Sequence, residues 1–179
     1  AGRVDDVQLH TGLRVDAYQV KWSQYPSSFT FNDLTTPGGD KPALIAQLAD
    51  GWKQLRGQHP NKRVVVHLVT NHQPSPSTTA TLPMGSPEPQ PKHFAAFIHQ
   101  AWQQAKQGVT IPDVWKVTWE HLQITSTLSE NEFKQFVFDC ELEFGYVLPE
   151  AKPGTMFNKV LIDQISQLTE KFFKAVANP

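Results

Sequence analysis

Residues 14–22 read Arg-Val-Asp-Ala-Tyr-Gln-Val-Lys-Trp, and this stretch decides how the rest of the chain is arranged. Side chains alternate between the two faces of a β-strand. One face would carry Val15, Ala17, Gln19 and Lys21, and the other Asp16, Tyr18, Val20 and Trp22. A face that passes from apolar residues to Gln19 and Lys21 is unusual for a core strand, because a lysine there must reach water or an anion.

A second strand is predicted just before this one, over residues 4–10, with a tight turn at residues 11–12. Asp5 and Asp6 lie near the start of that strand. An aspartate that precedes a Gln-x-Lys run across a hairpin is the arrangement of a metal-dependent nuclease site. The simpler interpretation is that the aspartates are a solvated strand start and that Lys21 is the surface end of an edge strand.

Three stretches, taken in order, resemble one family of proteins: Tyr18–Trp22, Ser28–Leu34 and Val69–Asn71. The first contains Gln-Val-Lys and resembles the PD-(D/E)xK nuclease superfamily in its variant with glutamine in place of the first acidic residue, as in Mrr-type restriction enzymes. Together the stretches resemble the double-stranded DNA endonuclease domain at the N-terminus of bacterial antiphage effectors, in CBASS and in STAND-type Avs proteins. The recognisable motifs cover residues 3–75.

The resemblance implies a mixed α/β fold of the restriction-endonuclease-like class and hydrolysis of DNA phosphodiester bonds with Mg²⁺ or Mn²⁺. It implies Asp6, Gln19 and Lys21 as catalytic residues. The metal ligands would be Asp6, Gln19 and the carbonyl of Val20, with Asp5 as the reserve carboxylate. Such hard cations take oxygen ligands, polarise a phosphate and lower the pKa of bound water. Lys21 would orient the attacking water and stabilise developing charge.

The resemblance also sets expectations for the surroundings of the site. Family members place a helix and a strand before the aspartate, whereas this sequence begins at Ala1, so we expect either a missing first part of the fold or a trimmed fold. The implied partners are double-stranded DNA and a C-terminal sensor, NTPase or oligomerisation domain, with a homo-oligomer as the active form. The alternative is a non-catalytic interaction or oligomerisation module that keeps the nuclease-like fold.

Composition predicts one globular domain over residues 1–179, with 39% apolar and 18% charged residues. No apolar run approaches the roughly 20 residues that a membrane span needs, and the polar N-terminus does not resemble a signal peptide. The single cysteine, Cys140, excludes an internal disulfide and indicates a reducing cytoplasm. A net charge of −1 gives no overall attraction to nucleic acid, so DNA binding would need a local basic patch.

Hydrophobic periodicity predicts the remaining elements. Helices are expected over residues 41–57 with Asp40 as N-cap, over 91–107, after a capping box at residues 129–132, and over 156–177. Strands are expected over residues 62–70, 112–127 and 138–144. Residues 73–91 contain six of the fourteen prolines and are expected to form a flexible insert.

Several residues allow two interpretations. His72, just past a buried strand, is either a catalytic group or a loop histidine. Trp115 and Trp119 could stack on bases, although packing of a sheet on a helix is the commoner use of such a pair. Residues 139, 141 and 143 would form an acidic outer face that disfavours DNA, while Cys140 packs inward. The sequence contains no HExxH, P-loop or GxGxxG motif, which disfavours zinc, NTPase and dehydrogenase chemistry.

Overall fold

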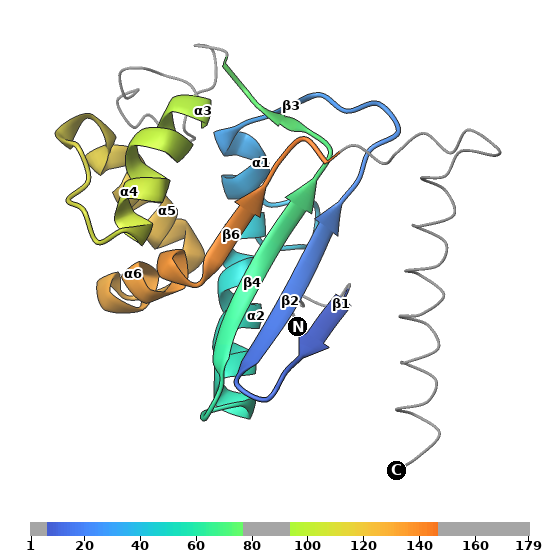
Figure 1. Ribbon diagram of the computed structural model, residues 1–179. Coiled ribbons are helices and arrows are strands. Elements are labelled where there is room, and N and C mark those ends of the chain that lie inside the picture. Colours follow the sequence, from blue (N-terminus) through green and yellow to red (C-terminus); the bar gives the residue numbers. More distant parts are fainter. Residues whose placement is uncertain (1–6, 77–93, 147–179) are drawn as a thin grey trace, which may run out of the picture. The chain divides into compact units, whose positions relative to one another are not determined.

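The predicted N-terminal hairpin is present in the computed structural model, which describes residues 7–76 and 94–146 (Figure 1). Strand β1 (Val7–His10) pairs antiparallel with β2 (Arg14–Lys21). The backbone N–H of Thr11 donates to the carbonyl of Arg14 at 2.8 Å and closes the turn. Residues 4–6 of the expected first strand lie outside the described part of the chain.

Strand β4 (Arg63–Thr70) lies parallel beside β2, and helix α2 (Leu44–Gln58) connects the two strands. A helical crossover is the usual way to join neighbouring parallel strands. Residues 64–68 of β4 are all buried, as its continuous apolar sequence predicts. The buried stripe predicted for α2 is confirmed, and its members are Leu44, Ile45, Leu48, Trp52 and Leu55.

The predicted start of α2 is wrong by three residues, because Ala43 rather than Asp40 is the N-cap. Lys41 instead exchanges two backbone hydrogen bonds with Gly38, each of 3.1 Å, and this turn keeps it out of the helix. Pro42 has the same effect, since a residue that precedes proline is disfavoured in the helical conformation. The helix can therefore begin only after Pro42.

Helix α6 (Glu130–Phe138) begins with the predicted capping box and leads directly into β6 (Cys140–Glu143). The backbone N–H of Ser129 donates to the carboxylate of Glu132 at 3.0 Å. Strand β6 pairs parallel with β4, so the sheet order is β1-β2-β4-β6.

The alternation predicted over residues 138–144 is wrong at its start, since Phe138 belongs to the helix and is 44% exposed. Asp139 is only 4% exposed and does not belong to an acidic outer face. Cys140 packs in the core as predicted, and burial raises the pKa of its thiol.

Between β4 and α6 the chain forms a helical layer. The helix predicted over residues 91–107 is observed as α3 (Phe94–Phe97), the π-helix η1 (Ile98–Trp102) and α4 (Gln103–Lys106). Gly108 follows with φ of 74°, the left-handed conformation in which glycine ends helices.

The extended segment predicted over residues 112–127 is wrong. These residues form the 3₁₀-helix η2 (Asp113–Trp115) and helix α5 (Lys116–Ser126). The buried residues there are spaced three or four apart, a helical period: Trp115, Thr118, Leu122 and Ser126. Trp119 packs on the Phe133 ring at 5.1 Å and Trp115 on the Phe97 ring at 5.4 Å, so these tryptophans serve packing, but between helices and not between a sheet and a helix as expected.

A small second sheet forms where a flexible insert was predicted. Strand β3 (Ser28–Phe29) pairs parallel with β5 (Gln73–Pro74), and the N–H of Ser75 donates to the carbonyl of Phe29 at 2.7 Å. The prediction of a flexible insert is therefore wrong for residues 73–74, and residues 77–93 lie outside the described part. Helix α1 (Phe31–Thr35) follows β3.

The protein is thus a mixed α/β structure with a four-stranded mixed sheet flanked by helices. Figure 1 shows α1 and α2 behind the sheet, and no described helix crosses the face turned toward the viewer. In the described residues no helix combines the length and apolarity needed to cross a membrane. The expected helix over residues 156–177 lies outside the described residues, and a single domain over residues 1–179 stays a prediction.

Buried Asp139 should be a major contributor to stability. It accepts hydrogen bonds from Arg63 Nε at 3.2 Å, Trp52 Nε1 at 3.3 Å and Gln135 Nε2 at 3.1 Å. Asp139→Ala should lower the free energy of unfolding by about 1–3 kcal/mol, because the buried Trp52 Nε1 loses its acceptor and Arg63 loses its ion pair. Urea denaturation measures this change. Asp50→Ala on the exposed side of α2 is the control and should change stability by about 0.5 kcal/mol or less.

Candidate active site at the end of strand β2

The predicted Gln-Val-Lys run forms the last three residues of β2. Gln19 is 8% exposed, and alternation places it on the face that also carries Lys21 and that packs on the helices. The side chain of Val20 lies on the opposite face and is 40% exposed. Asp5 and Asp6 lie outside the described residues. The structure therefore positions the Gln-Val-Lys half of the expected site.

Lys21 lines a hollow of about 340 Å³ at the carboxyl ends of β2 and β4. The walls of the hollow come from the end of β2, the β3–α1 segment, the turn before α2 and the residues after β4. Its polar and aromatic lining includes Lys21, Trp22, Asp33, Lys41, Gln47 and His72. The carboxyl ends of parallel strands are the usual place for ligand sites in α/β sheets.

Hydrogen bonds tie the chain after β2 to the chain after β4. The N–H of Ser23 donates to Asn71 Oδ1 at 3.1 Å, and Asn71 Nδ2 donates to the carbonyl of Ser23 at 2.7 Å. The N–H of Ser27 donates to Nδ1 of His72 at 3.0 Å. One ring nitrogen of His72 is therefore occupied in holding a loop, which favours the loop interpretation for that atom.

The charges in the hollow favour an anion. In the part of the chain that the structure describes, neither Lys21 nor Lys41 forms an ion pair. Asp33 is the acidic residue of the lining, and its carboxylate accepts hydrogen bonds from the N–H and Oγ1 of Thr30, each at 2.7 Å. Two unpaired ammonium groups beside an already bonded carboxylate would attract a phosphate.

The residues at the end of β2 fit the oxygen chemistry of a hard divalent cation. Gln19 offers an amide oxygen and Val20 a backbone carbonyl, both of types that Mg²⁺ accepts. Asp6, the expected carboxylate ligand, is outside the described residues. Within the described ranges no group of three or more His, Cys, Asp or Glu could hold a metal ion. The complete ligand set stays a prediction.

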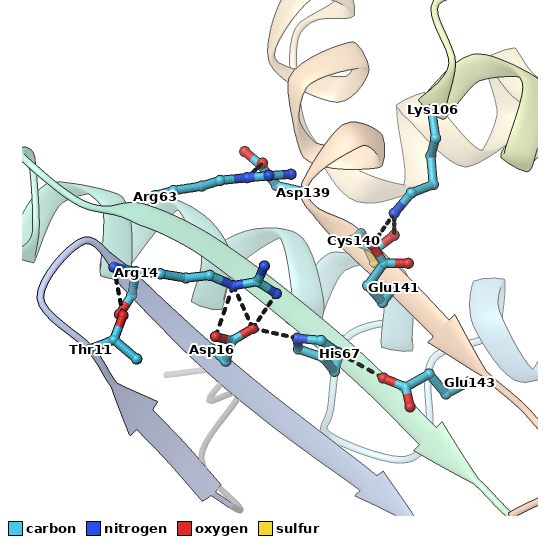
Figure 2. A network of polar contacts seen from close by, with 10 residues as sticks. All are labelled: Thr11, Arg14, Asp16, Arg63, His67, Lys106, Asp139, Cys140, Glu141 and Glu143. Carbon is cyan, nitrogen blue, oxygen red and sulfur yellow. Dashed lines mark hydrogen bonds and ion pairs between the residues drawn. The ribbon is translucent and has the colours of Figure 1, made fainter.

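A second polar cluster lies on the opposite face of the sheet (Figure 2). Nε of Arg14 donates to both carboxylate oxygens of Asp16, at 2.8 and 2.9 Å. Nε2 of His67 on β4 lies 2.8 Å from Asp16 Oδ1, and its Nδ1 lies 2.7 Å from Glu143 Oε1 on β6. The cluster therefore ties three neighbouring strands together on this face.

The electrostatics of this cluster favour charged groups. His67 is 7% exposed, and each of its ring nitrogens lies within hydrogen-bonding distance of a carboxylate. Burial opposes ionisation of Asp16, but hydrogen bonds from Arg14 and His67 hold its pKa below 3.8. The ring of Tyr18 stacks on His67 at 4.3 Å, and burial, together with the charge of Asp16, raises the pKa of its phenol.

Sequence reasoning did not identify this cluster as a unit. Alternation placed Asp16 on the face opposite Gln19 and Glu143 on an outer face, both of which the structure confirms. The available signal was His67, a polar residue inside a run of valines, because a buried polar side chain needs partners. Sequence reasoning also missed Lys41, which it placed in the first turn of α2.

No protein-family model matches this chain, and no curated protein matches it. The assignment of the site therefore depends on the positions of its own residues. The arrangement at the end of β2 can bind a phosphate at Lys21, whereas the cluster around His67 on the other face has its charges paired.

The depressed pKa of Asp16 predicts a pH-dependent contribution to stability. A carboxyl group with a lower pKa in the folded state stabilises the fold above its unfolded pKa, and this contribution disappears as the pH falls through the folded value. Asp16→Asn should therefore destabilise the protein at neutral pH by about 1–2 kcal/mol. The difference from wild type should shrink below about pH 4. Urea denaturation at several pH values measures it, and a difference that is independent of pH would contradict the argument.

Proposed function

We propose that this chain is a metal-dependent DNA endonuclease domain of a bacterial antiphage effector, with a restriction-endonuclease-like fold. One observation supports this proposal above the others. The first two of the three stretches on which the family resemblance depends are close in sequence and the third lies far from them, yet residues within them or directly next to them line one hollow. These residues are Lys21 and Trp22 from the first stretch, Phe29 and Asp33 from the second, and His72 directly after the third.

The topology supports the same proposal. A hairpin, a crossover helix and a parallel strand bring Gln19 and Lys21 to the carboxyl edge of the sheet, where α/β folds carry ligand sites. Lys21 is the last residue of its strand and pairs with Thr70 in the ladder. Its Cα atom is thus held at the edge of the hollow by a rigid element, which suits a catalytic residue.

The proposed roles follow from the chemistry of each group. Asp6, Gln19 and the carbonyl of Val20 would hold Mg²⁺ or Mn²⁺, which when bound polarises the phosphate and acidifies a bound water. Lys21 would orient the attacking water and stabilise the negative charge that develops on the phosphate oxygens. Gln19 contributes a neutral ligand, so the site would carry one negative charge fewer than a pair of carboxylates. With one carboxylate fewer nearby, the Lys21 ammonium group would be less drawn to protein carboxylates and freer to bind the phosphate.

The wider context belongs to the same proposal. The substrate is double-stranded DNA, and a C-terminal sensor, NTPase or oligomerisation domain controls cleavage. The active form is a homo-oligomer in the cytoplasm. Since the chain carries a net charge of −1, the basic hollow and the other subunits would supply the attraction to DNA.

One observation favours a second candidate, a non-catalytic interaction module. On the face of the sheet that no described helix crosses, Val7 is 49% exposed, Leu9 45% and Val20 40%. Exposed apolar side chains on neighbouring strands can form a contact surface for another protein. In this case the fold would be kept for assembly, and Lys21 would have no chemical task.

Lys21→Ala tests the proposed function. With Mg²⁺ or Mn²⁺, the wild-type chain should nick or linearise supercoiled plasmid, and EDTA should abolish the activity. Lys21→Ala should cleave about 100- to 1,000-fold more slowly, the usual effect of removing one group that stabilises transition-state charge. Agarose-gel assays of initial rates measure the effect.

Lys134→Ala is the matched control, because it removes one lysine from α6, where Lys134 pairs with Glu130 at 2.6 Å. It should cleave at the wild-type rate. Equal rates for wild type and Lys21→Ala, or no cleavage by the wild type with either metal, would contradict the nuclease proposal. A stable oligomer in light scattering without cleavage would favour the interaction module.

A further inference from the structure

Two aromatic side chains are exposed on the loop between β2 and β3, and one of them lines the hollow. Tyr25 is 80% exposed and Trp22 is 46% exposed, and Trp22 also lines the hollow. A single exposed aromatic residue is common on protein surfaces. Two of them, three residues apart on a loop whose first residue lines the hollow with two lysines, need a more specific explanation.

The loop that carries these aromatic residues is held in one conformation. Its start is fixed by the two hydrogen bonds between Ser23 and Asn71, and its end by the hydrogen bond from Ser27 to His72. Within the loop, Ser23 Oγ and the backbone of Tyr25 are hydrogen bonded at 3.0 and 3.2 Å. Tyr25 is therefore presented by a fixed backbone, which lowers the entropy that its binding to a partner would cost.

Lys41 lies in the lining of the same hollow, on the turn before α2. Its backbone exchanges two hydrogen bonds with Gly38, so the position of its Cα atom is fixed. Its side chain is exposed and forms no ion pair within the described residues. Lys41 is thus available for an anion close to Lys21, but on a different element.

We propose that Trp22, Tyr25 and Lys41 form the surface that docks duplex DNA on the site. Lys41 neutralises a backbone phosphate next to the one that is cleaved. Tyr25 and Trp22 pack on the deoxyribose rings of flanking nucleotides, which stay accessible in a duplex. The inference depends on the proposed function, because it takes the phosphate near Lys21 to be the scissile one.

A nucleic acid fits these groups better than an apolar partner would. The phosphates pair with the ammonium groups of Lys21 and Lys41, while the sugars cover the aromatic side chains. An apolar protein surface would cover Tyr25 but would leave both ammonium groups desolvated without a partner, which is costly. With an overall charge of −1, the chain also needs a local basic surface of this kind to hold DNA.

Fluorescence anisotropy of a labelled DNA duplex tests the proposal, with the full chain in EDTA so that no cleavage occurs. Tyr25→Ala should weaken binding about 5- to 100-fold, whereas Tyr25→Phe should bind like wild type because it keeps the ring. Lys41→Ala should weaken binding and reduce the slope of log affinity against log salt by about 1. Lys41→Arg should restore both quantities.

The controls remove similar groups elsewhere. Leu13→Ala removes an 82% exposed apolar side chain at the turn of the hairpin, and Lys134→Ala removes one lysine from α6. Both should bind DNA like wild type. The proposal is overturned if the wild type does not bind the duplex, if Tyr25→Ala and Lys41→Ala bind it like wild type, or if the controls lose as much affinity.

Cleavage assays separate this inference from the proposed function. Lys21→Ala should lose about as much affinity for the duplex as Lys41→Ala, because each removes one phosphate contact, but at saturating DNA only Lys21→Ala should cleave far more slowly. If wild type binds DNA through Tyr25 and Lys41 but does not cut it with Mg²⁺ or Mn²⁺, the docking surface stands and the nuclease proposal fails. If wild type cuts DNA and the Tyr25 and Lys41 variants bind and cut it normally, the docking surface fails and the nuclease proposal stands.

Discussion

The parallel pairing of β2 with β4 is the constraint on which the rest of the structure depends. It runs without interruption from Arg14 opposite Arg63 to Lys21 opposite Thr70. Because the register is continuous, one face of the two strands is mostly apolar and is covered by α1 and α2, while the other carries Asp16 and the polar groups bonded to it. The same pairing brings the ends of both strands to one edge, and the hollow forms there. A shift of one residue would exchange these faces, so the core itself fixes the position of the site.

The cluster in Figure 2 shows how polar groups reinforce this pairing on the face without described helices. His67 lies between carboxylates from the two strands beside its own, so its side chain links β2 and β6, each of which pairs with β4 through the backbone. Arg14 completes the charge balance around Asp16. We interpret this cluster as structural support for the strands that carry the site, and the hollow on the other side of the sheet as the reactive region.

Sequence reasoning succeeded where a pattern depends on local geometry. Alternation along β2 predicted which of its side chains share a face, because the two-residue period follows from the geometry of a single strand. Sequence reasoning failed over η2 and α5. The two-residue spacing of Trp115 and Val117 suggested a strand, whereas the buried residues of this segment recur every three or four positions, as in a helix. The position of Lys41 in the hollow could not be predicted, because it depends on a turn that delays α2. The contacts of His67 depend on a parallel register, which is set by packing between distant segments.

The bonds between Ser23 and Asn71 have a mechanical consequence. Asn71 binds the backbone of Ser23 through both its amide oxygen and its amide nitrogen, so two hydrogen bonds join the segments that follow β2 and β4. The end of β2 and the end of β4 therefore form one block, with no hinge between them. Any motion that displaces Lys21 must carry Trp22 and the segment around His72 with it. Opening or closing around a ligand would have to come from the other wall of the hollow, where the short turn before α2 is joined to the sheet only through its flanking helices.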